Sequence, residues 1–247
     1  MYRKLTLLTT ALGIAFLFHN CTKEETLSTA SILDFYPLEI GRSITYRMDS
    51  TVFVNFNSRE EVHSYQVKDV VEDLITDNLN RPTYRIRRYI RDTAATQPWA
   101  DDATFLVTPT RNTLELNDNN LRFIKLHLPF RDDYSWKGNS YIDTYSTSSE
   151  VTYLDDWDYI YANTNQPYGF DTEVVDSTVT VYERDEVIGD PDVETVFSRR
   201  DYSVEIYGKG IGLIYKNFLH REFQPATPGK AAYILGYGIM LTMIRHD

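Results

Sequence analysis

Runs in which apolar and polar residues alternate constrain the fold of this chain more than any other feature. Between residues 43 and 56, Ile44, Tyr46 and Met48 share one parity, and polar residues fill much of the other. Successive side chains of a strand point to opposite faces, so this run predicts a β-strand with one buried face. Residues 172–185 alternate as cleanly and predict a second strand of the same kind.

Turn-forming residues separate a series of such runs. Residues 117–120 (Asn-Asp-Asn-Asn) are a hairpin signal. Further strands are expected over residues 61–76, 83–92, 104–108, 113–117, 121–128, 141–145, 149–161, 210–218 and 233–245. Residues 193–207 fit either a strand or a short helix. About ten strands with little helix predict a mainly-β fold, either a single curved antiparallel sheet or a half-barrel or barrel.

The composition is that of an ordered, β-rich domain. The chain contains 19 Tyr, 12 Phe and 3 Trp, and aromatic residues favour half-buried strands. It contains one cysteine, which excludes a disulfide framework and a cysteine-based metal site. We therefore expect one domain over residues 34–247 that is stabilised by its core, with two smaller domains as the alternative.

The first residues have the pattern of a secretory signal. A basic start with Arg3 and Lys4 precedes an apolar run over residues 5–18. That run is about 14 residues long, short of the roughly 20 that span a bilayer as a helix. The pattern predicts a cleaved signal peptide over residues 1–20.

Cys21 decides which kind of signal this is. Phe18-His19-Asn20-Cys21 resembles the lipobox of bacterial lipoproteins, with Phe18 where Leu is usual and an uncommon His19. The resemblance implies cleavage before Cys21 and attachment of fatty chains such as palmitate to it. A free thiol buried in the core is the alternative reading.

The residues after the cysteine indicate a location. Lys23, Glu24 and Glu25 follow Cys21 closely and are similar to the export tag of Bacteroidota lipoproteins. The similarity implies a lipid-anchored protein of the bacterial outer membrane, exposed at the cell surface. We interpret residues 21–33 as a solvated tether.

The charge balance limits the partners. The chain carries 25 basic and 36 acidic side chains, a net charge of −11, and removal of the signal peptide makes this charge more negative. An acidic surface argues against nucleic acid as a partner and against unassisted adhesion to anionic lipid. The lipid anchor is therefore the expected contact with the membrane.

Two longer stretches resemble a group of Bacteroidota lipoproteins of the outer membrane or cell surface whose function is not established. Residues 36–46 (YPLEIGRSITY) are similar to their opening pattern, with Ile44 where Trp is usual, and residues 207–215 (YGKGIGLIY) to their closing pattern. The resemblance implies a curved antiparallel sheet like the half-barrel of periplasmic lipoprotein carriers. No catalytic residue comes with it.

Motifs with a known chemistry are few. The glycines of residues 208–212 do not form a nucleotide-binding loop, because an aromatic strand follows them instead of a helix; a close approach of backbone explains them better. The acids of residues 155–158 lack the further ligands and glycine of a calcium loop. The histidines have no metal-ligand spacing, and the Gly-x-Ser-x-Gly elbow is missing. We expect no metal and no cofactor.

The remaining candidates are binding residues. Arg85 and Arg87 share a strand face and could hold an anion bidentately, although acids on neighbouring strands are the more usual partners of such arginines. Trp136 and Trp157, with Trp99, are candidates for stacking on a ligand. The first hypothesis is a non-enzymatic lipoprotein whose concave sheet binds a hydrophobic ligand or a protein. A glycan-binding accessory lipoprotein and a hydrolase whose site the sequence does not reveal are the alternatives.

Overall fold

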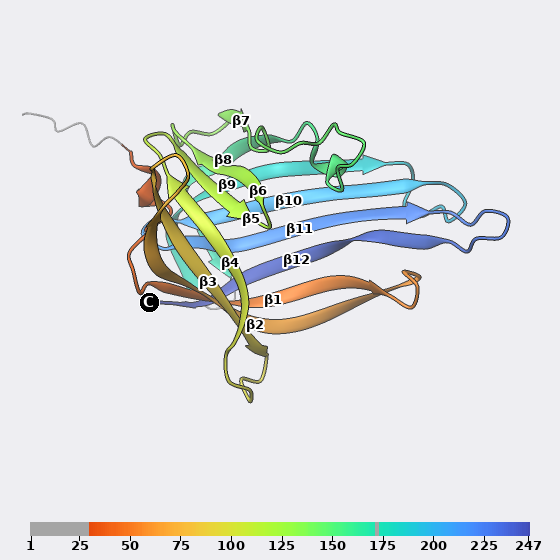
Figure 1. The fold of residues 1–247 in the computed structure, drawn as a ribbon, viewed down its shortest axis with the longest axis horizontal. Coiled ribbons are helices and arrows are strands. Elements are labelled where there is room, and N and C mark those ends of the chain that lie inside the picture. Colours follow the sequence, from red (N-terminus) through yellow and green to blue (C-terminus); the bar gives the residue numbers. More distant parts are fainter. Residues whose placement is uncertain (1–29, 171–172) are drawn as a thin grey trace, which may run out of the picture.

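The structure is a computed structural model that describes residues 30–170 and 173–247. Cys21, the signal peptide and most of the tether lie outside the described residues. The described chain forms twelve strands, which Figure 1 labels. They are β1 (Ser43–Val54), β2 (Arg59–Thr76), β3 (Pro82–Asp92), β4 (Ala100–Pro109), β5 (Thr113–Asp118), β6 (Leu121–His127), β7 (Ser135–Lys137), β8 (Asp158–Phe170), β9 (Glu173–Ile188), β10 (Ser198–Gly208), β11 (Gly212–Gln224) and β12 (Tyr233–His246). Two short 3-10 turns, η2 (Ile32–Asp34) and η3 (Thr152–Leu154), complete the elements.

All twelve strands belong to one antiparallel sheet of order β6-β5-β4-β3-β2-β1-β12-β11-β10-β9-β8-β7. In Figure 1, β3 to β6 cross in front of the long strands β8 to β12. The two edge strands meet, because Ile124 on β6 donates its backbone N–H to the carbonyl of Gly138 at 2.8 Å. The Trp136 indole N–H bonds the Ile124 carbonyl at 2.7 Å. The sheet is therefore a nearly closed, barrel-like structure, which confirms the mainly-β prediction.

Local details follow the sequence closely in the hairpins. Asn119 and Asn120 join β5 to β6 with φ of 49° and 63°, a left-handed conformation that asparagine tolerates well. The two closing strands pair with each other, as β11 with β12. Residues 193–207 contain nearly all of β10 and no helix.

The prediction of strands over residues 141–145 and 149–157 is wrong. These residues belong to a long connection between β7 and β8, here called the β7–β8 loop (residues 138–157). The Asp143 side chain accepts the backbone N–H groups of Tyr145 and Ser146 at 3.1 and 3.0 Å. Short polar side chains that bond nearby backbone in this way compete with strand pairing.

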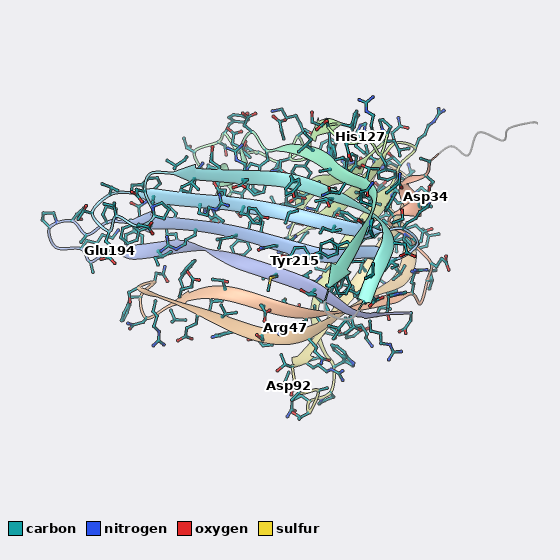
Figure 2. All side chains as sticks on the ribbon, turned by 180° about the vertical axis from the view of Figure 1, so that it is seen from behind. Asp34, Arg47, Asp92, His127, Glu194 and Tyr215 are labelled. Carbon is teal, nitrogen blue, oxygen red and sulfur yellow. The ribbon has the colours of Figure 1, made fainter. Side chains whose placement is uncertain are left out.

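The chain buries apolar side chains on both faces of the sheet. The larger cluster lies in the barrel interior and includes Val107, Leu126 and Tyr161. A smaller one includes Val175 and Ile206, with Tyr168, Phe170 and Tyr215 packed against it. Seen from behind in Figure 2, the end of the β8–β9 hairpin turns across β10 to β12 near Tyr215. The hairpin end thereby covers part of the outer face.

The folded part begins earlier than residue 34. Ile32 is 2% exposed and lies in the interior cluster. Two side chains cap η2: the Ser31 hydroxyl accepts the Leu33 N–H, and the Asp34 carboxylate accepts the Ser31 N–H. Gly210, at φ 72°, donates its N–H to the Asp34 carbonyl at 2.7 Å. The glycines after β10 therefore serve a close approach of backbone, as the sequence indicated.

Gly138 tests the closure of the barrel. An added Cβ would lie 2.4 Å from the Tyr159 ring, which is 1% exposed and held by its hydroxyl to Asn139. We expect Gly138→Ala to lower the free energy of unfolding by about 1–3 kcal/mol in urea denaturation. Gly169→Ala on β8 is the control, since its Cβ meets nothing nearer than 3.5 Å. An equal loss in both variants would contradict the role assigned to Gly138.

Candidate functional site

A cavity of about 460 Å³ lies inside the barrel. Its volume falls within the range of roughly 300–1,000 Å³ that is usual for small-molecule sites. Much of the wall is apolar, and strands from both sides of the barrel contribute to it. The apolar wall includes Phe105, Leu116, Phe123, Phe218, Ile239 and Leu241. Such a wall suits a ligand with a substantial hydrocarbon portion.

The exposure of the lining residues shows where the cavity meets solvent. Asp102, Asn119 and Tyr237 line it and are exposed, and Tyr237 is 44% exposed. Val107 and Leu114 line it and are almost fully buried, at 0% and 1%. The mouth therefore lies near the β5–β6 turn and the middle of β12, and the cavity deepens from there.

The β7–β8 loop closes one side of the mouth. The Tyr153 ring stacks on His220 of β11, with ring centroids 3.8 Å apart and an angle of 12° between planes. The Trp157 indole N–H donates to the Tyr153 carbonyl at 2.8 Å, and the Asn139 amide donates to the Leu154 carbonyl at 2.9 Å. These bonds hold Tyr153, Leu154 and Trp157 in the cavity wall.

A cluster of four charged side chains, three of them buried, crosses the interior: Lys125 of β6, Glu183 of β9, Glu205 of β10 and the partly exposed Lys216 of β11. The Lys125 ammonium contacts Glu183 Oε1 at 2.5 Å and Glu205 Oε1 at 2.8 Å. Lys216 reaches the same Glu205 oxygen at 3.1 Å. Ser203 donates to Glu183 Oε2 at 2.6 Å, and the Tyr207 hydroxyl donates to Glu205 Oε2. We call these four residues the charge cluster.

The cluster perturbs the pKa values of its carboxyl groups in opposite directions. Burial raises the pKa of Glu183, and the nearby charge of Glu205 adds to this rise. Burial would also raise the pKa of Glu205, but Lys125 and Lys216 outweigh it and lower the pKa to about 2. For Lys125, burial favours the neutral amine, yet the two glutamates hold its pKa well above the usual value. Lys125 and Glu205 are therefore both charged in the interior at neutral pH.

A second ion pair lines the cavity on the β2–β3 side. The Arg88 guanidinium contacts both oxygens of Asp69, at 2.6 and 2.7 Å, and lies 4.7 Å from the centre of the Phe105 ring. Tyr36 and Tyr46 lie close enough to feel both charges, and burial first, then Asp69, raises the pKa of each phenol. Both tyrosines therefore remain neutral hydrogen-bonding groups.

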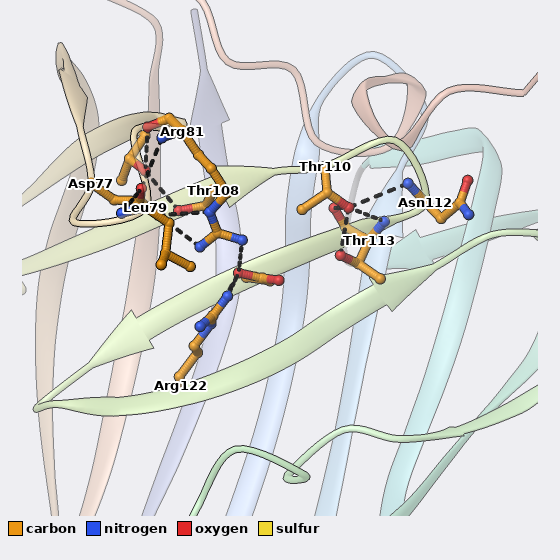
Figure 3. A network of polar contacts seen from close by, with 10 residues as sticks. Asp77, Leu79, Arg81, Thr108, Thr110, Asn112, Thr113 and Arg122 are labelled. Carbon is orange, nitrogen blue, oxygen red and sulfur yellow. Dashed lines mark hydrogen bonds and ion pairs between the residues drawn. The ribbon is translucent and has the colours of Figure 1, made fainter.

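The arginines that the sequence singled out face acids of the neighbouring strands. Arg85 contacts Glu72 at 2.7 Å and Asp73 at 3.1 Å, and Arg87 contacts Asp101 at 3.0 Å. Neither lines the cavity. Figure 3 shows a similar arrangement of ion pairs elsewhere in the sheet, where Arg81 and Arg122 both contact Glu115. Arg85 and Arg87 are thus engaged in structural ion pairs.

The tryptophans offer little surface for stacking on a sugar. Trp136 is 8% exposed and bonds the Ile124 carbonyl near the barrel closure. Trp157 is 2% exposed and does line the cavity. Trp99 is partly exposed, but the Arg91 guanidinium lies 4.1 Å from its ring centre. Trp136 and Trp157 therefore offer the glycan alternative no exposed stacking surface, and the Trp99 ring already lies against a guanidinium.

The remaining acidic candidates form no cation site. Lys137 contacts Asp156 at 2.6 Å and Asp158 at 2.9 Å at the surface. Within residues 30–170 and 173–247, no group of three His, Cys, Asp or Glu side chains is placed to hold a metal ion.

Sequence reasoning missed the charge cluster, although a signal was present. Leu121, Phe123 and Lys125 share one parity of their strand, and Val181 and Glu183 share one parity of theirs. A charged residue on the apolar parity of a strand indicates a buried charge that needs a partner. Which strands would bring the partners together depends on the closure of the sheet, which local sequence does not encode.

Lys125 tests whether the cluster supports the fold. Lys125→Met leaves Glu183 with no ammonium partner in the described structure, so we expect the free energy of unfolding to fall by about 3 kcal/mol or more. The measurement is urea denaturation at pH 7. Lys137→Met is the matched control, because its ion pairs are more than half exposed at the lysine and such pairs contribute about 1 kcal/mol or less. Similar losses for both variants would contradict the interpretation.

No helix in the described part of the chain is long and apolar enough to cross a membrane. No protein-family model matches the chain, and neither a curated protein nor a solved structure matches it. The geometry of the cavity is therefore the basis for inferring a function.

Proposed function

We propose that this protein is a membrane-anchored lipoprotein, attached through Cys21, that binds a hydrophobic or amphipathic ligand inside its barrel without catalysing a reaction. The observation that carries the proposal is the cavity of about 460 Å³ with its largely apolar wall. Folding ordinarily closes such a void, because unfilled apolar space costs free energy. A retained cavity with an exposed rim supports a binding role.

The size and chemistry of the wall favour a ligand with an alkyl chain. Phe105, Leu116 and Phe123 face the cavity from one side of the barrel, and Phe218 and Ile239 from the other. Each methylene moved from water into this environment contributes about 0.8 kcal/mol, or about fourfold in Kd. Several methylenes suffice for useful affinity.

The charge cluster supports binding over hydrolysis. Two carboxyl groups with separated pKa values are typical of acid–base pairs. Here, however, all four oxygens of Glu183 and Glu205 already accept a contact from Lys125, Lys216, Ser203 or Tyr207. Both carboxyl groups are therefore engaged by other side chains of the barrel, and proton transfer at a substrate would first have to displace one of these donors.

The location in the outer membrane rests on the sequence. The leader, Cys21 and the acidic residues after it support lipid anchoring, and Ile32, about ten residues after Cys21, already belongs to the interior cluster. A tether of that length keeps the barrel close to the bilayer. The anchor would thus place the cavity near a source of hydrophobic ligands.

Blocking the cavity tests the binding role. Ala103 lines it, so Ala103→Phe should fill space and weaken binding of the neutral fluorescent probe N-phenyl-1-naphthylamine by about tenfold. Ala100→Phe, at an exposed position of the same strand, is the control and should bind as the wild type does. Fluorescence titration measures both. Equal affinity in the two variants, or no binding by the wild type, would contradict the proposal.

Replacing the anchor residue tests the location. Cys21→Ala should prevent acylation and cleavage, so the protein should accumulate with its leader attached and without fatty chains. Mass spectrometry of the native N-terminus should find fatty chains on Cys21 of the wild type. An unmodified Cys21 there would remove the lipoprotein assignment while leaving the binding role intact.

A further inference from the structure

Lys216 differs from the other members of the charge cluster in its accessibility. Its side chain is 24% exposed, whereas those of Lys125, Glu183 and Glu205 are 6%, 3% and 1% exposed. Lys216 is also among the residues that line the cavity. The accessible part of the cluster is therefore an ammonium group.

The hydrogen-bonding capacity of Lys216 is incompletely used. A lysine ammonium has three N–H donors. The Lys125 ammonium contacts two carboxylates. By contrast, the one charged contact of Lys216 within residues 30–170 and 173–247 is Glu205 Oε1 at 3.1 Å. That acceptor is shared with Lys125. Lys216 thus retains donors for a further acceptor in the cavity.

The acids of the cluster do not offer the complementary opportunity. Every oxygen of Glu183 and Glu205 already accepts a contact. Asp69, the next acid in the wall, is held through both oxygens by Arg88. A cationic group inside the cavity would have to share these acceptors with donors already in place, whereas an anionic group would find the unused donors of Lys216.

We propose that Lys216 holds the headgroup of a long-chain carboxylate, with the alkyl chain along the apolar wall. This inference rests on the proposed binding function and specifies its ligand class. Phe218 lies two residues after Lys216 on the same face of β11, and Leu241 of β12 is the cross-strand partner of Lys216. An ionised carboxylate on an ammonium group in such surroundings forms a hydrogen bond about twice as strong as a neutral one.

The charges of the cluster balance when all four groups are ionised. An incoming carboxylate then meets no excess of negative charge in the cluster, and the accessible member of the cluster is the Lys216 ammonium.

Acids near the mouth oppose this preference. Asp102 and Asp118 line the cavity as well, and Asp102 is exposed. Their charge slows the approach of an anion and would favour an amine at the rim. The rim acids act on a ligand at the mouth, whereas Lys216 acts on the headgroup inside the cavity. Comparing the equilibrium affinities of ligands with different headgroups therefore distinguishes the role of Lys216 from that of the rim acids.

Three ligands with the same twelve-carbon chain test the proposal: dodecanoate, methyl dodecanoate and dodecylamine. Each ligand is titrated to displace N-phenyl-1-naphthylamine from the full-length protein at pH 8, at ligand concentrations too low for the ligand to form micelles. We expect the wild type to bind dodecanoate about tenfold more tightly than the ester. In Lys216→Met this preference should fall to about one, with affinity for the ester unchanged.

Two further variants serve as controls. Lys216→Arg keeps the positive charge and should keep most of the preference for the acid. Lys209→Met removes an exposed lysine from the nearby β10–β11 turn and should behave as the wild type. Lys216→Met leaves Glu205 in contact with Lys125 and Tyr207, so urea denaturation should show that it still folds.

The outcomes distinguish the inference from the function on which it rests. Equal affinity of the wild type for acid and ester, tighter binding of the amine, or an undiminished preference in Lys216→Met would overturn the inference alone. Failure of the wild type to bind the ester and the naphthylamine would contradict the binding function, and the inference with it.

Discussion

The buried ammonium of Lys125 is the contact on which the barrel interior depends. It extends from β6 in the front wall to carboxylates on β9 and β10 in the rear wall. Apolar contacts between the walls are not directional, so they leave the spacing of the walls adjustable. A charge in the interior needs its partners at close range, and this requirement fixes how near the walls approach and how much space stays empty beside them.

Other charged side chains are also paired, but most of these pairs lie nearer the surface, where keeping the charges costs less free energy. Arginines of β3 face acids on β2 and β4, where solvent screens their contacts. These pairs settle register between neighbouring strands more than they stabilise the fold. Arg88 and Asp69 are the exception, since both are mostly buried and the pair lines the cavity. The interior thus holds its ions in satisfied groups, with Lys216 as the least satisfied.

Most of the strands could be predicted from the sequence, but little of the candidate site could. The alternation of apolar and polar residues correctly predicted β1, β3, β5, β6 and β9, because a strand with one buried face carries an apolar side chain at every second residue. It failed between β7 and β8, where Asp143 bonds local backbone in place of a partner strand. The cavity brings Lys125 to Glu205 across eighty residues of chain, and such a meeting depends on how the sheet curves. Arg85, Arg87 and Trp136 were conspicuous in the sequence for structural reasons, whereas Lys216 was inconspicuous.

The junction between β6 and β7 has a mechanical consequence. Neighbouring strands elsewhere in the sheet share ladders of backbone bonds. At this junction, β6 is joined by the Ile124–Gly138 backbone bond, the Trp136 indole and the bonds of His127 with the Tyr134 and Tyr161 hydroxyls. Regions held by few bonds open at a smaller free energy than the molecule as a whole. The wall should therefore part along this line before the eleven strand pairings do, and the contacts of Lys125 with β9 and β10 limit how far the lumen can widen.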